Sequence, residues 1–513
     1  MRCPYTGIET GHPFRYPRSM MSGGGHYETF GQAPELDGAS AWFNVDKPLR
    51  LSELRGKIVL LHFWTSCSVN CMHVLTDLGR LEESYSDALV IVSIHSPKYP
   101  NEKSSDRLGR IIEQYGIRHA VANDEDLVLW RTSAVRAWPT LCLIDPEGEV
   151  VAAFAGEGHF KELDRRIAAL VKTCRELGNL DESPFSYVLE EPVAQSDSLL
   201  YPGKICIDPA SERVFVSDTG HNRIVVCSLD GKMLECIGSG KTGLADGSFE
   251  QATFRKPQGL AVSNGRLYVA DTGNHAVREC DLGKRYVFKF AGGGERGDYR
   301  TMSGGMDTLL SSPWDLEIVD GMLFIAMAGS HQVWRGAIES RNLRPFAGSG
   351  IEGLSDGAGP SAHLAQPSGI SHGGDFLYIA DSETGAIRRA NLLSSGYMET
   401  LVGRGLFEFG DEVGRFTATR LQHPMGVQWY EDRLYVADSY NHRVKVLYPK
   451  EMSVSNVAGT GRPGCGRGIG GALNEPGGIA VHKGALYIAD TNNHRIAVMN
   501  LESGELSTLP IRF

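Results

Sequence analysis

The sequence predicts a multi-domain protein in which an α/β domain precedes an all-β propeller with six blades. Its 513 residues exceed what one hydrophobic core usually organises. In the first third of the chain, continuous apolar runs alternate with segments of helical periodicity. The remainder of the chain repeats one sequence pattern six times, at intervals of about 52 to 57 residues. Such a repeat is typical of the blades of a β-propeller.

Composition and charge exclude several classes of protein. A hydrophobic content of 42% and a charged content of 22% are typical of a globular chain. The net charge of -11, without a local basic block, argues against a nucleic-acid partner. No run of about twenty apolar residues is present, and the N-terminal segment lacks the apolar run of a signal peptide. We therefore expect a cytoplasmic location and no membrane partner.

Changes in composition divide the chain into four parts. Residues 1–30 are rich in Gly, Pro and Ser and are expected to form an N-terminal tail. Residues 31–178 carry the α/β pattern. Residues 179–202 combine acidic, Pro and Ser residues without sustained periodicity, which is typical of a linker. Residues 203–513 hold the repeats and are expected to form the propeller.

Four apolar segments define the expected sheet of the first domain. Residues 57–64 and 88–94 are continuous and rich in branched residues, which is typical of buried parallel strands. Residues 140–144 and 149–154 flank a tight turn and predict a hairpin. Apolar residues at helical spacing follow the first strand and recur near the end of the domain. This order predicts a mixed sheet covered by helices.

Each of the six repeats supplies a short strand, a turn, an aromatic-containing strand, a polar turn and two further strands. The repeats resemble the NHL family, whose blades carry the same order of strand, Asp, Asn-His-Arg and strand. Blade 3 departs from this pattern with Ser330-His331-Gln332, and blade 4 with Thr384-Gly385-Ala386. Aligned on the residue that follows the second strand, the repeats fall at Asp218, Asp271, Met327, Asp381, Asp438 and Asp490.

Histidines recur in five of the repeats and raise the question of a metal site. A structural role explains the recurrence better, since a residue that builds every blade must appear in nearly every blade. We expect each Asp to pair with the Arg that begins the next strand, and Asn to adopt the left-handed turn between them. No metal is predicted. The histidines are His221, His275, His331, His442 and His494.

The connections between blades are long and rich in Gly. Because strands within a blade alternate in direction, these connections share one face with the turn between the second and third strands. We expect a protein or peptide partner to bind this loop face. Asp246, Asp356 and Asp411 lie there at comparable positions, and either a cation or ordinary turn chemistry explains them; we favour the turn.

The stretch HFWTSCSVNCMHVL, which begins at His62, holds the only close pair of cysteines, Cys67 and Cys71. With its surroundings, this stretch resembles the thioredoxin-like family, particularly its TlpA-type thiol–disulfide oxidoreductases. The segment VRAWPTLCLIDPEGEVV, which begins at Val135, adds to the resemblance. Pro139 matches the family's cis-proline and implies a cis Trp138–Pro139 bond. The residues that the resemblance implies in substrate binding are Trp64, Ser68, Trp138, Pro139 and Thr140.

Alignment of the Phe-Trp pair places Cys71 at the family's resolving cysteine and Ser68 at its nucleophile. The motif Cys-x-x-Cys therefore reads Ser68-Val69-Asn70-Cys71. The nucleophile position lies at a helix N-terminus, where amide dipoles favour a thiolate. A serine hydroxyl does not ionise near neutral pH, so ordinary thioredoxin exchange is not expected.

Three interpretations of the two cysteines follow. In the first, Cys67 attacks and Cys71 resolves, while His62, at the place of the family's buried acid, accepts a proton. In the second, the cysteines and a histidine bind copper, as in Sco-type chaperones; no histidine lies in residues 134–139, and His73 follows too closely. In the third, both thiols are simply packed, and the domain serves for docking.

The combination of the two domains resembles the NHL repeat-containing protein 2 group. The resemblance implies an interaction protein without a cofactor, which binds a protein or peptide at the propeller loop face and an interdomain cleft. The alternative is a thiol–disulfide oxidoreductase that uses Cys67 and Cys71. A propeller hydrolase or lyase is a third class, and it requires carboxylates and histidines that converge on the channel.

Overall fold

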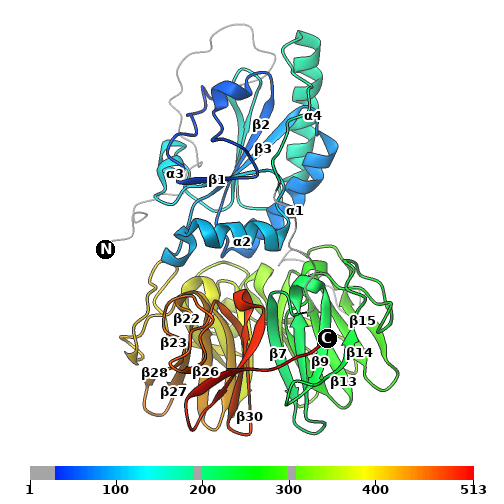
Figure 1. The fold of residues 1–513 in the computed structure, drawn as a ribbon, viewed down its shortest axis with the longest axis vertical. Coiled ribbons are helices and arrows are strands. Elements are labelled where there is room, and N and C mark those ends of the chain that lie inside the picture. Colours follow the sequence, from blue (N-terminus) through cyan, green and yellow to red (C-terminus); the bar gives the residue numbers. More distant parts are fainter. Residues whose placement is uncertain (1–28, 190–197, 298–307) are drawn as a thin grey trace. The chain divides into compact units, whose positions relative to one another are not determined.

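The computed structural model describes residues 29–189, 198–297 and 308–513 (Figure 1). Contacts divide the chain into unit 1, residues 1–194, and unit 2, residues 195–513. The division falls inside the segment expected to be the linker. Most of the expected N-terminal tail lies outside the described residues.

Unit 1 is built on one mixed sheet of six strands, in the order β1-β4-β3-β2-β5-β6. β2, β3 and β4 run parallel, whereas β5 is antiparallel to β2 and forms a hairpin with β6. This arrangement confirms the mixed sheet expected from the sequence. The strands are β1 (Ala41–Phe43), β2 (Ile58–Trp64), β3 (Leu89–His95), β4 (Ala120–Asn123), β5 (Thr140–Ile144) and β6 (Val150–Ala155).

Helices cover both faces of this sheet, because successive side chains of a buried strand point to opposite faces. Leu60 faces a core formed with α1 and α4, and Leu61 faces a second core formed with η1 and α3. Figure 1 shows α1 and α4 beside one another. The helical elements of unit 1 are η1 (Leu51–Leu54), α1 (Val69–Ser84), η2 (Pro100–Lys103), α2 (Ser105–Tyr115), α3 (Val128–Thr132) and α4 (Phe160–Leu177).

The first half of the expected linker packs on unit 1. Lys57 Nζ donates to the carbonyl of Asp181 at 2.8 Å, and the Val188 amide donates to the carbonyl of Asn44 at 2.9 Å. Phe185 and Tyr187 pack against the core on the η1 side. The described residues 179–189 contain no helix or strand and are anchored by only a few side chains. The sequence therefore shows no periodicity in this segment.

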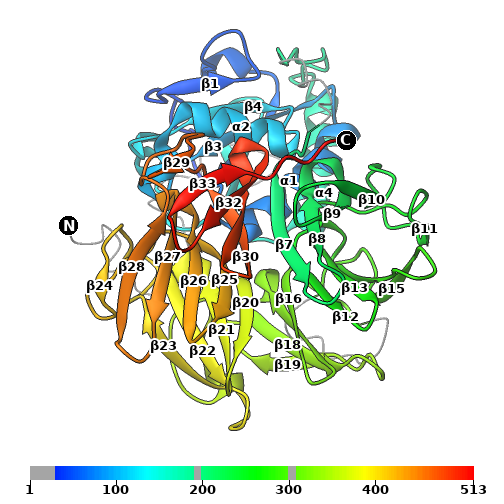
Figure 2. The same cartoon turned by 60° about the horizontal axis from the view of Figure 1, so that its bottom comes forward.

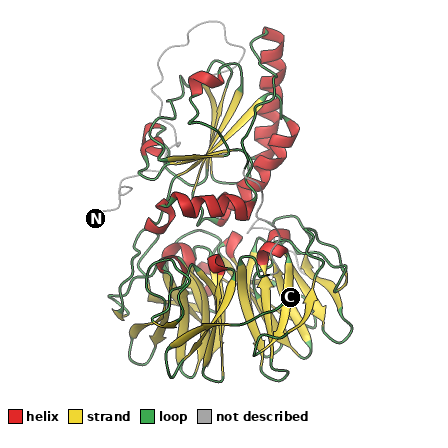
Figure 3. Cartoon of the chain, in the orientation of Figure 1, coloured by secondary structure: helices red, strands yellow, loops and turns green. Residues whose placement is uncertain are grey.

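Unit 2 contains six antiparallel sheets, and thus six blades, in the described residues. Figure 2 shows the blades following one another in chain order, and Figure 3 shows that strands dominate this unit. Blade 1 holds β7 (Pro202–Asp208), β8 (Arg213–Asp218), β9 (Arg223–Ser228) and β10 (Met233–Ile237). Blade 2 holds β11 (Gly247–Ser248), β12 (Leu260–Ser263), β13 (Arg266–Asp271), β14 (Ala276–Asp281) and β15 (Tyr286–Gly292). Blade 3 holds β16 (Pro313–Val319), β17 (Met322–Met327), β18 (Gln332–Ala337) and β19 (Arg344–Ala347).

The remaining three blades follow the same plan, with the first long strand of each lining the centre. Blade 4 holds β20 (Pro367–Gly373), β21 (Phe376–Asp381), β22 (Ala386–Asn391) and β23 (Tyr397–Val402). Blade 5 holds β24 (Gly414–Arg415), β25 (Pro424–Tyr430), β26 (Arg433–Asp438), β27 (Arg443–Tyr448) and β28 (Ser453–Ala458). Blade 6 holds β29 (Gly468–Ile469), β30 (Pro476–His482), β31 (Ala485–Asp490), β32 (Arg495–Asn500) and β33 (Glu505–Thr508).

The repeated Asp at the end of the second strand holds the incoming interblade connection. One carboxylate oxygen accepts a backbone amide of that connection at 2.7–2.8 Å in five blades. In blade 3 the sulfur of Met327 accepts the amide of Ser311 instead. The pairs are Asp218 with Leu200, Asp271 with Arg255, Asp381 with Ala365, Asp438 with Gln422 and Asp490 with Asn474.

In five blades, a hydroxyl directly after this position joins the blade to its neighbour. It donates at 2.6–2.8 Å to the carbonyl of the Pro that opens the neighbouring blade. Blade 3 has Ala328 at this position and lacks the bond. The pairs are Thr219 with Pro257, Thr272 with Pro313, Ser382 with Pro424, Ser439 with Pro476 and Thr491 with Pro202.

The recurrent histidines are structural, but in a different way from that expected. In four blades the His itself occupies the left-handed position, with φ of 49–53°, and Asn does so only in blade 1, at Asn222. The expectation that Asn takes this turn was therefore wrong for the other blades. The His adopts it because its Nδ1 then accepts an amide of the next blade at 3.1 Å. The pairs are His275 with Ser312, His331 with Gln366, His442 with Glu475 and His494 with Tyr201.

The expected ion pair between the Asp and the Arg that begins the next strand occurs in blades 1 and 6, at Arg223 and Arg495. In blades 2, 4 and 5 a fully buried cation two residues further along reaches the Asp instead. The same cation also binds the acid that the sequence suggested as a cation ligand or turn residue. These triads are Asp271–Arg278–Asp246, Asp381–Arg388–Asp356 and Asp438–Lys445–Asp411.

Replacement of Ala328 by Ser is expected to stabilise the propeller by about 1 kcal/mol, because a hydroxyl here gains a bond to the carbonyl of Pro367. The matched change Ser439→Ala is expected to destabilise it by a similar amount, since it removes this bond in blade 5. Urea unfolding of both variants measures the two effects. A loss of stability in Ala328→Ser would show that the blade 3 backbone lies out of reach.

Candidate functional site

The two cysteines and Ser68 lie at the junction of β2 and α1. Ser68 is the N-cap of α1, Cys67 precedes the cap, and Cys71 lies in the first helical turn. Cys71 is fully buried in an apolar cluster of unit 1 that includes Trp64 and Leu108. The hydroxyl of Thr65 lies 3.4 Å from the sulfur of Cys67. Ser68 thus places a hydroxyl at the N-terminus of α1, and its assignment to the nucleophile position of the motif stays a prediction.

A buried acid, Glu102 of η2, holds the backbone and hydroxyls that lead into the cysteine motif. Its carboxylate is fully buried and accepts hydrogen bonds from residues on two separate segments. This acid therefore fixes the junction between β2 and α1. The donors are Thr65 Oγ1 at 2.9 Å, Ser66 Oγ at 2.7 Å, Cys67 N at 2.8 Å, Lys98 N at 3.1 Å and Tyr99 N at 3.0 Å.

The charges around Glu102 keep it ionised and keep its histidine neighbour neutral. Burial opposes the charge of Glu102, but Arg107, His95 and the hydrogen bonds together outweigh burial and lower the pKa of Glu102 to about 2. Burial lowers the pKa of His95 to about 4, despite the nearby Glu102. The neutral ring of His95 accepts the amide of Ser66 at its Nε2, at 3.3 Å.

His62, the candidate proton acceptor, is fully buried on β2 and begins a chain of hydrogen bonds. Its Nδ1 lies 3.1 Å from the hydroxyl of Ser93, which lies 2.7 Å from Nε2 of His119. His119 Nδ1 in turn lies 3.8 Å from Glu82, a residue of α1. Burial, and then His119, hold the pKa of His62 well below its usual value. The role of His62 as a proton acceptor stays a prediction, and this ring is neutral near pH 7.

The loop before β5 has the conformation expected from the sequence. The Trp138–Pro139 bond is cis, and the carbonyl of Pro139 accepts the amide of Gly156 at 2.8 Å. The Trp138 indole donates to the carbonyl of Ser96 at 2.9 Å. Thr140 is fully buried, and its hydroxyl donates to its own chain at Ala137.

The structure gathers some of the predicted site residues into unit 1's core. Trp64, Cys71 and Trp138 share one apolar cluster. Trp64 is fully buried. Its role in substrate binding stays a prediction, as do the roles of Ser68 and Pro139. Glu102 was missed from the sequence. Its signal was the segment after β3, where Pro100 begins a short helical turn and the acid is the third residue of that turn. The partners in the cysteine motif lie about 35 residues away in the chain.

Comparisons with known proteins agree with this arrangement. A thioredoxin-like family model matches residues 56–150, and an NHL repeat model matches residues 254–280 and 473–499. NHL repeat-containing protein 2 of Gallus gallus is 40% identical over 518 residues, which cover 93% of this chain and 71% of that protein. The chain belongs to the NHL repeat-containing protein 2 family. The fold class and the family expected from the sequence are confirmed.

Two further relatives share parts of this architecture. Protein SUPPRESSOR OF QUENCHING 1, chloroplastic, of Arabidopsis thaliana is 42% identical over 505 residues, and the match covers 94% of this chain and 48% of that protein. Thiol-disulfide oxidoreductase ResA of Bacillus thuringiensis is 28% identical over 119 residues, or 23% of this chain and 66% of that protein. Within the described part of the chain, no helix combines the length and apolar character needed to cross a bilayer.

Unit 1 is expected to lose about 3 kcal/mol of stability as the pH falls from 6.5 to about 4. His95 has a pKa of about 4 in the folded state against 6.5 when unfolded, so the unfolded chain takes up the proton first. The buried His62 acts in the same direction. Urea unfolding at a series of pH values, read by pulsed hydrogen exchange of β2 at one fixed labelling pH, measures this slope. His95→Gln should flatten it, and an unchanged slope in that variant would contradict the assignment.

Proposed function

We propose that this chain is a cytosolic protein- or peptide-binding scaffold whose thioredoxin-like unit has a modified thiol site. The two-domain architecture supports a scaffold or a redox-related role. The observation that favours the scaffold is Ser68 at the N-cap of α1. Helix dipoles and amides at this place favour a thiolate, whereas a hydroxyl stays protonated and does not attack disulfides near neutral pH.

Packing of the second cysteine supports the same proposal. Cys71 lies in an apolar cluster with residues of α2, where a thiol serves as a small hydrophobic side chain. The frame around it, from Glu102 to Pro139, is that of a complete thioredoxin-like unit. Such a unit keeps the loops with which this fold receives an extended chain, even when the exchange chemistry is lost.

The loop face of unit 2 supplies the second part of the proposed surface. Two interblade connections expose apolar side chains near this face, at Ile351 and Phe407, with exposed fractions of 54% and 41%. Side chains of this kind on neighbouring loops can bind the apolar residues of a partner. The loops beneath them are held in place by the buried ion triads and amide bonds of each blade.

The alternative function is a thiol–disulfide oxidoreductase that uses Cys67 and Cys71. Both are thiols in this structure, and Thr65 gives the Cys67 sulfur a hydroxyl neighbour. Thiol-disulfide oxidoreductase ResA matches this part of the chain. In this case Cys67 would attack a substrate disulfide, and Cys71 would displace the substrate thiol and leave a Cys67–Cys71 disulfide, which an external dithiol then reduces.

Ser68→Cys should convert the unit into an active exchanger, because it places a thiol at the N-cap next to an unchanged frame. We expect reduction of insulin by dithiothreitol to proceed at the background rate with the wild-type chain and well above it with this variant. Ser68→Ala is the matched control and should stay at background. Equal rates for the wild type and Ser68→Cys would contradict the scaffold proposal.

Native thiol titration separates the two functions. For the scaffold, we expect no reversible disulfide between Cys67 and Cys71 when the intact chain is equilibrated with glutathione buffers and read by peptide mass spectrometry. For the oxidoreductase, the bond forms reversibly, and Cys67→Ala abolishes exchange while Cys142→Ala, in the core of unit 1, leaves it intact. That second outcome would overturn the scaffold proposal.

A further inference from the structure

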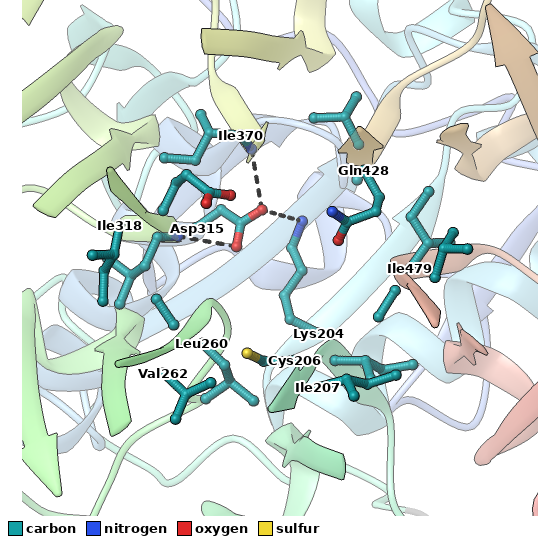
Figure 4. A pocket seen from close by; sticks show the side chains of 18 of the residues that line it. Lys204, Cys206, Ile207, Leu260, Val262, Asp315, Ile318, Ile370, Gln428 and Ile479 are labelled. Atoms are coloured by element: carbon teal, nitrogen blue, oxygen red, sulfur yellow. Dashed lines mark hydrogen bonds and ion pairs between the residues drawn. The ribbon is translucent and has the colours of Figure 1, made fainter. Parts of the chain in front are cut away.

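The centre of the propeller encloses a cavity of about 300 Å³, lined by the innermost strands of all six blades. This volume is at the lower end of those that hold small molecules. Apolar walls come from Ile207, Val262, Ile318 and Val481, near the hairpin turns that join first and second strands. Lys204 and Asp315 lie near the opposite ends of their strands, and Figure 4 shows them pointing toward one another.

An ion pair closes that end. Four blades have Gly at the position that Lys204 and Asp315 occupy in the other two, because neighbouring strands meet there backbone to backbone. A Cβ on Gly259 would lie 2.4 Å from the Cα of Asp315, and one on Gly478 would lie 2.7 Å from the Cα of Lys204. Only two side chains therefore enter the channel at this level, and they carry opposite charges.

The Lys204 ammonium has three partners within the protein, which match its three N–H donors. It lies 3.3 Å from Asp315 Oδ2 and donates to the carbonyl of Ser368 at 2.8 Å and to that of Met425. Asp315 also accepts the amide of Ile370 at 3.1 Å. Lys204 and Asp315 thus neutralise one another and join four blades. A ligand in the rest of the cavity must therefore be bound by other side chains.

The next level toward the mouth is acidic and polar. Glu317 follows Asp315 by two residues on β16 and so lies on the same side of the strand. Among the described residues, no ion pair includes Glu317, and among those that line the cavity only Lys204 is basic. Gln428, at the same level of β25, donates its amide nitrogen to the carbonyl of Trp429 at 3.1 Å and thus offers its oxygen to the cavity.

We propose that this channel binds a small organic cation with N–H donors, of the guanidinium or primary ammonium class, whose head contacts Glu317 and Gln428. The lining has one basic and three acidic side chains, Asp208, Asp315 and Glu317, so it favours a positive ligand. A planar guanidinium donates two parallel hydrogen bonds to a carboxylate. The aliphatic walls beyond this level then enclose an alkyl tail.

The site has a defined pH dependence. Burial, and then Asp315, raise the pKa of Glu317 to about 8, while the backbone amides of His372 and Ile318 oppose the rise. The other charged or titratable groups that face it are Lys204 and Cys206 on β7 and Asp208 at the mouth. A bound cation favours the ionised form of Glu317 and releases its proton, so affinity increases with pH.

Calorimetric titration of the full chain with methylguanidinium tests the proposal. The dissociation constant should fall about tenfold from pH 7 to pH 9, a range in which guanidinium stays charged. Each added CH₂ in the series from methyl- to butylguanidinium should tighten binding about fourfold, as expected for burial of a methylene. Glu317→Gln should weaken binding at least about tenfold. Glu505→Gln, the same change at an exposed residue of the outer strand β33, is the control and should bind as the wild type does.

Thermal unfolding of each variant checks that it folds, and Gln428→Leu provides a second lesion that leaves Glu317 in place. Both variants should reduce affinity without loss of secondary structure. The proposal is overturned if methylguanidinium gives no saturable heat, if Glu317→Gln binds as tightly as the wild type, or if calcium or zinc chloride alone saturates the site and displaces methylguanidinium. Tetramethylammonium, which lacks N–H donors, should bind much more weakly; equal affinity would likewise overturn the proposal.

Discussion

Closure of a ring of six sheets is the constraint on which the propeller depends. Neighbouring blades are joined by side chains that reach across each junction, and the last junction must join residues almost 300 positions apart. Thr491 and His494 of blade 6 bind the carbonyl of Pro202 and the amide of Tyr201 in the same way as their equivalents elsewhere. The ring therefore closes with the contacts of an ordinary interblade junction, and this explains why these side chains recur so strictly in the sequence.

The buried charge of Glu102 is a second constraint. It fixes the backbone at the start of the cysteine motif, so a substitution at Ser68 can change the chemistry of the motif without changing the fold. The acid fixes residues 65–67 through their backbone and hydroxyls, and Cys71 is held by packing of α1 against α2. The position between them, Ser68, is not part of either anchoring set. The frame of the motif therefore persists whether a thiol or a hydroxyl stands there, so chemistry at this position can be lost without loss of the fold.

The sequence predicted the fold well because its main signals are local. Continuous apolar runs gave β2 and β3 to within one residue, and the recurring Asp located all six blades, even where Met327 replaces it. It predicted the site less well because the interactions there are distant. Glu102 acts on residues far away in the chain. The left-handed position holds Asn222 in blade 1 and His275 in blade 2, and each side chain accepts an amide of the next blade. Nothing in the turn's own sequence distinguishes these two choices.

Departures from a repeat carry information of their own. Where the innermost strands approach most closely, backbone contact requires Gly, and side chains in only two blades must therefore point into the channel. Lys204 and Asp315 satisfy each other there, which removes both charges from further use. Two residues further along β16, Glu317 forms no ion pair with any of the described residues. Burial nevertheless makes the charged form of Glu317 unfavourable. A blade built only for stability would carry a neutral residue at this place, as blades 2 and 6 do with Ala261 and Ala480. The acid is thus best explained by a ligand whose positive charge compensates it.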